Sequence, residues 1–153
     1  MNNRVFFPGP SGSAYDAGMD TVRDEIRRAI IAASATPLEM RELPDAEAEP
    51  ICRQVVTHFV TGNRRWWWEG FGSDAVSLRT QQGWTRITEL VPEPDALVWF
   101  IAEGTPLPFN PVFEATPRTI QNVLGECFGF EYYLVAKDKS WILCENHHDC
   151  LIR

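Results

Sequence analysis

The sequence predicts an α+β domain in which N-terminal helices and one later helix pack on one face of a mainly antiparallel sheet of about five to seven strands. Helical periodicity dominates residues 16–62, whereas from residue 66 onward short apolar or β-branched runs follow one another between turns. Helices and strands do not alternate regularly, which argues against a doubly wound parallel sheet. A chain of 153 residues fits a single domain with a sizeable core.

Two helices are expected after a Gly-, Pro- and Ser-rich arm or loop at residues 1–15. The first begins near Asp16, and its apolar residues recur at steps of three and four: Met19, Val22, Ile26, Ala29, Ile30 and Ala33. Residues 36–50 contain three prolines among acids and predict a connection. Pro50 is placed to be the first residue of the second helix, which the pair Gly62–Asn63 would end.

Residues 66–153 predict the sheet with one inserted helix. The strand candidates are short, aromatic or β-branched, and bounded by Gly, Pro or Asp: Trp66–Glu69, Ala75–Leu78, Thr85–Leu90, Leu97–Ala102, Val112–Ala115, Phe130–Ala136, Trp141–Glu145 and Cys150–Ile152. The inserted helix begins at Thr116 and Pro117, because threonine caps a first turn well and proline suits the first helical position.

Composition excludes several classes of protein. A hydrophobic fraction of 44% and a charged fraction of 23% are ordinary for a globular domain. A net charge of −7 disfavours nucleic acid as a partner. No apolar run is long enough to span a membrane, and residues 1–10 contain no apolar leader segment, so we expect a cytoplasmic protein. The four cysteines form no CxxC pair and are expected to be reduced thiols.

The segment Cys144–Cys150, with the sequence CENHHDC, places two of the three histidines between acids and thiols. The simplest interpretation is a polar turn in which Asn146 and Asp149 bond local backbone groups. A zinc site is the alternative, but adjacent histidines on an extended segment point in opposite directions. Its least strained version combines His147 and Asp149 with the distant His58, and we expect neither a metal nor a cofactor.

The same segment offers a catalytic alternative. His147 or His148, flanked by acids, would suit a general base, and Cys144 or Cys150 would supply a thiolate nucleophile. Nucleophile and base usually come from separate segments, however, and no motif in the chain assembles a complete catalytic set. We therefore expect a binding protein rather than an enzyme.

The run Trp66–Trp68 suggests either core packing or an aromatic platform. In a strand Trp67 would face away from its two neighbours, so we expect most of the run to serve the core. One exposed tryptophan, with arginines and Glu69 nearby, would suit a protein interface. The segment Gly70–Gly72 lacks the remaining residues of a phosphate loop, so nucleotide binding is not supported.

Three C-terminal segments carry a resemblance to a known family. Val98–Ile101, Gly125–Tyr133 (GECFGFEYY) and Trp141–Asp149 (WILCENHHD) resemble the signature of a small, uncharacterised family of bacterial proteins. The similarity covers the C-terminal third to half of the chain. It implies no activity, ligand or catalytic residue, although small acidic bacterial proteins of this kind resemble immunity or adaptor modules.

Two hypotheses about function follow. In the first, the chain is an acidic protein-binding module of immunity or adaptor type that binds a basic partner through the loop and an adjacent sheet edge. Its candidate binding residues are Glu145, Asn146, His147, His148, Asp149, Trp67 and Glu69. Residues 66–153 carry 12 acidic and 6 basic residues, and such a charge would steer a basic partner. The alternative is a small metal-dependent or hydrolase-like enzyme with His147 or His148 as base or ligand.

Overall fold

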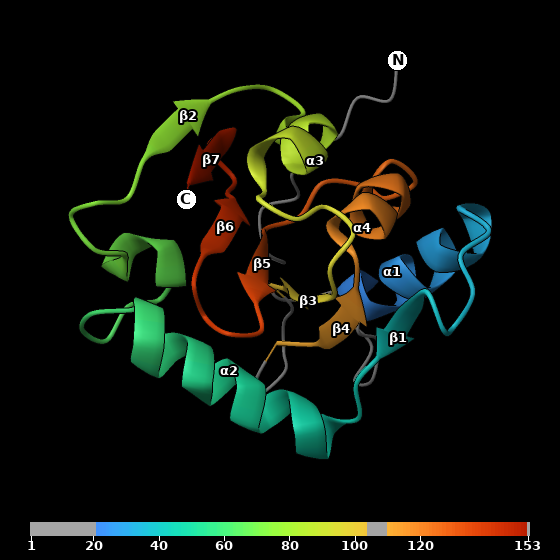
Figure 1. Cartoon of the computed structure of the whole chain (residues 1–153), viewed down its shortest axis with the longest axis horizontal. Coiled ribbons are helices and arrows are strands. Elements are labelled where there is room, and N and C mark those ends of the chain that lie inside the picture. The colour runs from blue at the N-terminus through green and yellow to red at the C-terminus, as the bar shows by residue number, and fades with distance from the viewer. Residues whose placement is uncertain (1–20, 104–109, 153) are drawn as a thin grey trace, which may run out of the picture.

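A computed structural model describes residues 21–103 and 110–152 and confirms the α+β class. Seven strands form one sheet in the order β1-β4-β3-β5-β6-β7-β2, and every neighbouring pair is antiparallel (Figure 1). In chain order the elements are α1 (Thr21–Ala32), β1 (Met40–Glu42), α2 (Asp45–Phe59), the 3-10 turn η1 (Trp67–Gly70), β2 (Ser77–Arg79), the 3-10 turn η2 (Gly83–Arg86), α3 (Ile87–Leu90), β3 (Val98–Ala102), β4 (Val112–Ala115), α4 (Pro117–Leu124), β5 (Tyr132–Ala136), β6 (Ile142–Glu145) and β7 (Cys150–Ile152).

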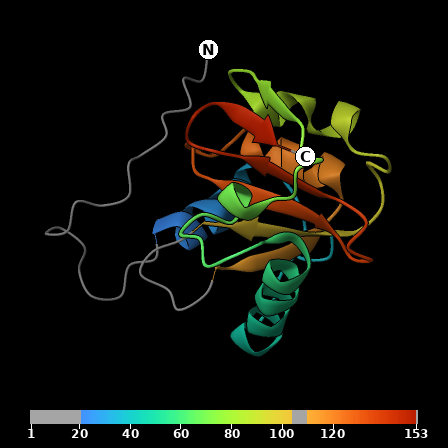
Figure 2. The same cartoon turned by 90° about the vertical axis from the view of Figure 1, so that its left-hand side faces the viewer.

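Helices cover both faces of the sheet, not one face as the sequence predicts. Strand β5 lies in the middle of the sheet, and all five of its residues are buried. Tyr132 and Leu134 join a core with the apolar sides of α1, α3 and α4, whereas Tyr133 and Val135 join a second core with α2. Figure 2 shows α2 set apart from the other helices by the strands. A strand that is apolar at successive positions needs cover on both sides, which explains the arrangement.

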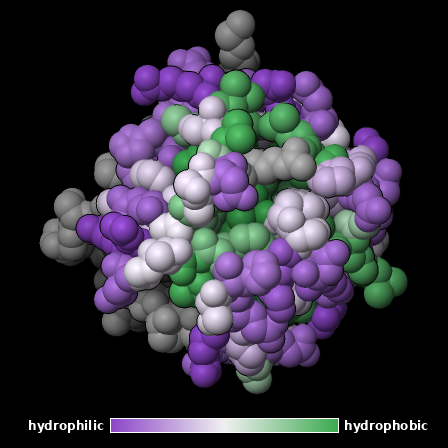
Figure 3. All heavy atoms as spheres, turned by 60° about the vertical axis from the view of Figure 1, so that its left-hand side comes forward, coloured by the Kyte–Doolittle hydropathy of each residue, from purple (hydrophilic) through white to green (hydrophobic). Residues whose placement is uncertain are grey.

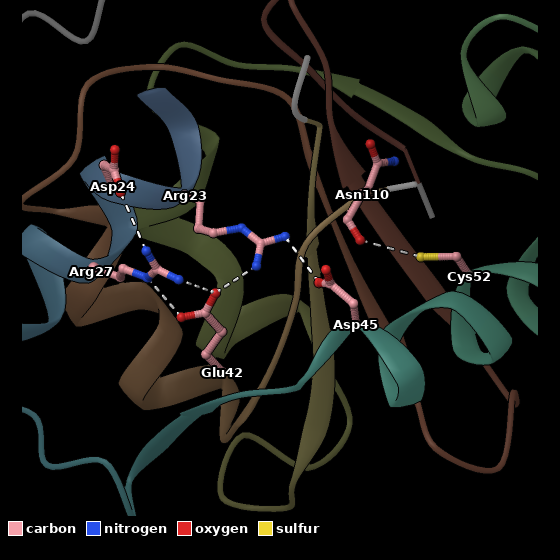
Figure 4. Close-up of polar contacts among 7 residues, drawn as sticks. All are labelled: Arg23, Asp24, Arg27, Glu42, Asp45, Cys52 and Asn110. Atoms are coloured by element: carbon pink, nitrogen blue, oxygen red, sulfur yellow. Dashed lines mark hydrogen bonds and ion pairs between the residues drawn. The ribbon is translucent and has the colours of Figure 1, made fainter. Parts of the chain in front are cut away.

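An ion-pair network joins α1 to β1 and to the start of α2 (Figure 4). The carboxylate of Glu42 accepts hydrogen bonds from Arg23 Nη1 at 2.9 Å and from Arg27 Nε at 2.8 Å. Arg23 also reaches Asp45 at 3.5 Å. Strand β1, which carries Glu42, lies inside the predicted connection at residues 36–50, and a strand of three residues has too little pattern to be recognised.

The second helix begins earlier than predicted. It starts at Asp45, and Pro50 lies inside it rather than at its first position. Acidic side chains at Asp45 and Glu47 suit the positive end of the helix, and Pro44, in an extended conformation, precedes it. The predicted start of the first helix at Asp16 and the predicted arm at residues 1–15 lie outside the described residues.

Two predicted strands are helical turns. Residues 67–70 form η1, and residues 83–90 form η2 followed by α3. In the second case the fully buried Ile87 packs into the α4 side of the core, so tertiary packing overrides the β propensity of Thr85 and Thr88. The later elements are confirmed, including the cap of α4, where Thr116 accepts a hydrogen bond from the Thr119 backbone at 3.2 Å.

Candidate functional site

The loop between β6 and β7 is a polar turn in which Asn146 bonds the local backbone as the sequence predicts. The side-chain oxygen of Asn146 accepts hydrogen bonds from the backbone of His148 at 3.0 Å and of Cys150 at 3.2 Å. Asp149 adopts a left-handed conformation with φ of 55°, which closes the loop. Because the Asn146 side chain holds the loop by bonding its backbone N–H groups, the side chains of His147 and His148 are left at the surface.

Two of the predicted binding residues do not reach the surface. Glu145 and Asn146 are both buried. Strand alternation turns Glu145 toward the α3 side of the sheet, where a β-carbon added at Gly83 would lie 2.6 Å from its Oε2. Buried side chains at these two positions do not offer a contact surface, whereas binding roles for His147, His148 and Asp149 remain predictions.

The central contact of the site joins His147 to Glu131, a residue that the sequence analysis missed. His147 Nδ1 lies 2.6 Å from Glu131 Oε2, and Trp68 Nε1 donates to Glu131 Oε1, also at 2.6 Å. Glu131 is 7% exposed, whereas the His147 side chain is 33% exposed. The carboxylate thus fixes both rings, and a neutral His147 that donates from Nδ1 keeps Nε2 as an acceptor.

Four side chains form a group of rings above this contact, which we call the ring cluster: Trp66, Trp68, His147 and His148. The two histidine rings lie 4.0 Å apart, Trp66 lies 5.1 Å from His147, and Trp68 lies 5.9 Å from His148. Trp66 and Trp68 stack with centroids 6.4 Å apart. Trp66 is in an extended conformation and directly precedes the 3-10 turn η1, which carries Trp68.

The predicted binding residues Trp67 and Glu69 occupy different environments. Trp67 turns inward and packs on Tyr133, with ring centroids 4.9 Å apart. Glu69 is exposed on the same turn. The sequence predicts that most of the run serves the core, and Trp67 and Trp68 do pack against the core on the α2 side, while Trp66 and Trp68 reach the ring cluster.

A second carboxylate, Glu103, lies next to Glu131. The backbone N–H of Glu103 donates to the Glu131 carbonyl at 2.9 Å, which continues the pairing of β3 with β5. Strand alternation places both side chains on the α2 side, with Tyr133 and Cys144. Burial, followed by repulsion from Glu131, raises the pKa of Glu103 to about 7, while Arg65 and a hydrogen bond from Asn110 lower it.

Two of the buried thiols, Cys144 and Cys52, are poor nucleophiles. Cys144 is fully buried, and burial together with the charges of Glu131 and Glu103 raises the pKa of its thiol well above the usual range. Burial also raises the pKa of Cys52 to about 12, and its thiol donates to the Asn110 carbonyl (Figure 4). A thiolate at either position is disfavoured, and only the half-buried Cys150 lies beside the loop histidines.

The proposed metal ligands are not gathered in the described part of the chain. Within residues 21–103 and 110–152, no three His, Cys, Asp or Glu side chains are placed to hold a metal ion. His58 lies in the last turn of α2, with its ring 4.7 Å from that of Phe59. The combination of His147 and Asp149 with His58 is therefore not assembled.

An apolar groove of about 620 Å³ lies beside strand β2. Its apolar lining includes Phe59, Phe71, Val76, Leu78, Trp141 and Leu151. Figure 3 shows apolar residues gathered at the centre of one face of the molecule, between hydrophilic margins. Val76 is 69% exposed and Leu78 is 38% exposed. Strand β2 ends the sheet, so one of its edges has no strand partner in the described structure.

The fold and site define a small α+β protein with one antiparallel sheet and a Glu–His–Trp contact at the start of β5. The chain belongs to a family of unknown function (DUF6756), whose model matches residues 19–153. Comparison with curated proteins and with solved structures gives no match. Among the residues that the structure describes, no helix is both long and apolar enough to cross a membrane.

Proposed function

We propose that the chain is an acidic protein-binding module of immunity or adaptor type, which binds a basic partner with the His147–Asp149 turn and the adjacent sheet edge. One observation carries the proposal. A single segment, residues 66–78, contributes Trp66 and Trp68 to the ring cluster and then Phe71, Val76 and Leu78 to the apolar groove. Aromatic and apolar side chains at a surface are typical anchors of protein interfaces.

The exposure of Val76 and Leu78 adds to this support. Apolar side chains that lie together on a surface, beside an unpaired strand edge, are costly unless another surface covers them. An extended segment of a partner could pair with β2 and place its own apolar side chains in the groove. The net charge of −7 favours a basic partner, whose association should slow as salt rises.

The test compares two double variants as baits in the organism's own extract. Val76→Lys with Leu78→Lys places charges at the groove, whereas Ile31→Lys with Leu38→Lys places them on exposed apolar residues elsewhere, 79% and 93% exposed. We expect the native chain and the control to capture the same protein, and the groove variant to lose it. Equal capture by all three baits would reject the groove as the interface.

A second candidate function rests on the contact of 2.6 Å between His147 and Glu131. A histidine oriented by a buried carboxylate is suited to act as a general base, as in a small hydrolase. The test is hydrolysis of p-nitrophenyl acetate, together with metal content, for the native chain, His147→Ala and His148→Ala. Turnover or bound metal lost only with His147 would support an enzyme, and hydrolysis no faster than that of free imidazole would reject it.

We also propose a bacterial, cytoplasmic setting, in which the segments Gly125–Tyr133 and Trp141–Asp149 are the family signature. The four free cysteines suit a reducing compartment. The two segments supply Glu131 and His147, the two ends of the central contact. If the signature maintains the contact between Glu131 and His147, family members in which one of these two residues differs should also differ at the other.

A further inference from the structure

The carboxylates under the ring cluster have unfilled hydrogen-bonding capacity. Glu103 Oε2 is buried and has no hydrogen-bond partner among the described residues. The hydroxyl of the fully buried Tyr133 also has no hydrogen-bond partner among the described residues. Burial, followed by the charges of Cys144, Glu103 and Glu131, raises the pKa of Tyr133, whose side chain lies on the same side of the sheet as the two carboxylates. An unfilled buried acceptor destabilises the folded protein, and a ligand that donates a hydrogen bond to it would remove that penalty.

A cation from the protein itself already lies at the rim of this site. The guanidinium carbon of Arg65 lies 4.7 Å from the centroid of the Trp66 ring, within cation–π range. The same side chain interacts with Glu103 and lowers its pKa. Arg65 belongs to an exposed loop, so its side chain can leave the ring without disturbing the core.

We propose that the ring cluster, together with Glu103 and Glu131, is a binding site for a cationic side chain of the partner, with an arginine guanidinium fitting best. The planar guanidinium would stack on Trp66 beside His147 in place of Arg65, and it would donate to the unfilled oxygen of Glu103. This inference rests on the proposed function, because the cation belongs to the bound partner. A site that binds a cationic side chain would make the module select a basic partner over a neutral one.

The geometry favours an organic cation over a metal ion. Both oxygens of Glu131 are already engaged, by Trp68 Nε1 and by His147, which leaves one free oxygen on Glu103. A single free oxygen is a poor metal site but a sufficient acceptor for one N–H group. The rings supply π faces, which attract guanidinium and ammonium groups.

The test is an NMR titration of the full chain with the peptide acetyl-Gly-Arg-Gly-amide. Two further peptides carry lysine or the neutral isostere citrulline in place of arginine. We expect saturable shifts of the Trp68 indole N–H and the His147 ring with the arginine peptide, at about millimolar concentration because the probe is small. Saturation by the lysine peptide as well would extend the site to ammonium groups. Equal shifts with citrulline, or no shifts with arginine, would overturn the inference.

Three variants sharpen the test. Glu103→Gln keeps the shape of the side chain and should weaken arginine binding at least tenfold. Arg65→Ala removes the internal competitor and should tighten binding several-fold, whereas Arg64→Ala, which alters the exposed neighbour that contacts Thr61, should leave it unchanged. Unchanged binding in Glu103→Gln would reject the site.

The outcomes separate this inference from the proposed function. If Val76→Lys with Leu78→Lys abolishes partner capture while the arginine peptide does not bind, the cation site is wrong and the binding module stands. If the arginine peptide binds as expected and the groove variant still captures its partner, the groove is wrong and the cation site stands.

Discussion

Replacing Glu103 by glutamine should change how the stability of the protein depends on pH. Burial raises the pKa of Glu103 from 4.5 to about 7 in the folded protein. Between these values the unfolded chain has released the proton while the folded chain still binds it, so stability falls as pH rises. Integrated over this range, the loss is about 3 kcal/mol. The loss is complete above pH 7, where the folded protein is ionised too.

Glu103→Gln cannot ionise and should not show this loss. Urea unfolding followed by tryptophan fluorescence at pH values between 4.5 and 8, at constant ionic strength, measures the difference from the native chain. We expect the variant to gain stability relative to the native chain as pH rises, by about 3 kcal/mol in total. The exposed Glu93→Gln serves as the control and should follow the native profile. Parallel profiles for the native chain and Glu103→Gln would refute the raised pKa and the burial that causes it.

Three further changes test the fold around the site. Gly83→Ala should lower the free energy of unfolding by about 1–3 kcal/mol in urea denaturation, because the new β-carbon would lie 2.6 Å from Glu145 Oε2. Thr116→Ala should cost about 1 kcal/mol in the same assay, since it removes the side-chain cap on the Thr119 backbone. Under native conditions Ellman's reagent should label a single thiol rapidly, and Cys150→Ser should abolish that reaction, because the other three cysteines are buried.

Each of these changes has an opposing result. An unchanged midpoint in Gly83→Ala would mean that Glu145 does not occupy the space beside η2. An unchanged free energy of unfolding in Thr116→Ala would mean that the Thr116 side chain does not stabilise α4 as a cap. Rapid labelling of two or more thiols in the native state would contradict the burial of Cys52, Cys127 or Cys144.

The fold class was predictable because the strongest patterns lie in the elements that form the core. Strand β5 is apolar over its whole length, and the pair Thr116–Pro117 carries both signals of a helix start. The short β1 and the turn at Trp67 were not predictable, because three residues have no period and a run of tryptophans suits a strand as well as a 3-10 turn. Packing of Trp67 on Tyr133 decides between them.

The candidate site was half predictable. His147 and His148 were recognisable because they stand in a polar turn, but the groups beneath them come from other strands. Glu103 and Glu131 are 28 residues apart and become neighbours only through the pairing of β3 with β5. A usable signal was present, since each is a single acid at the end of an apolar strand. Its meaning depends on a strand order that local patterns do not encode.

Site-specific photo-crosslinking tests most directly whether the groove beside β2 binds a protein partner. A photoreactive phenylalanine analogue at Leu78 tests the groove, and the same analogue at Ile31 of α1 provides a control of comparable hydrophobicity on an exposed surface. Each chain is irradiated in the extract of its own organism, and the products are identified by mass spectrometry. We expect Leu78 to give one dominant crosslinked protein with a basic surface, and Ile31 to give none. The same product from both positions, or no product from Leu78, would contradict a protein-binding function for this face.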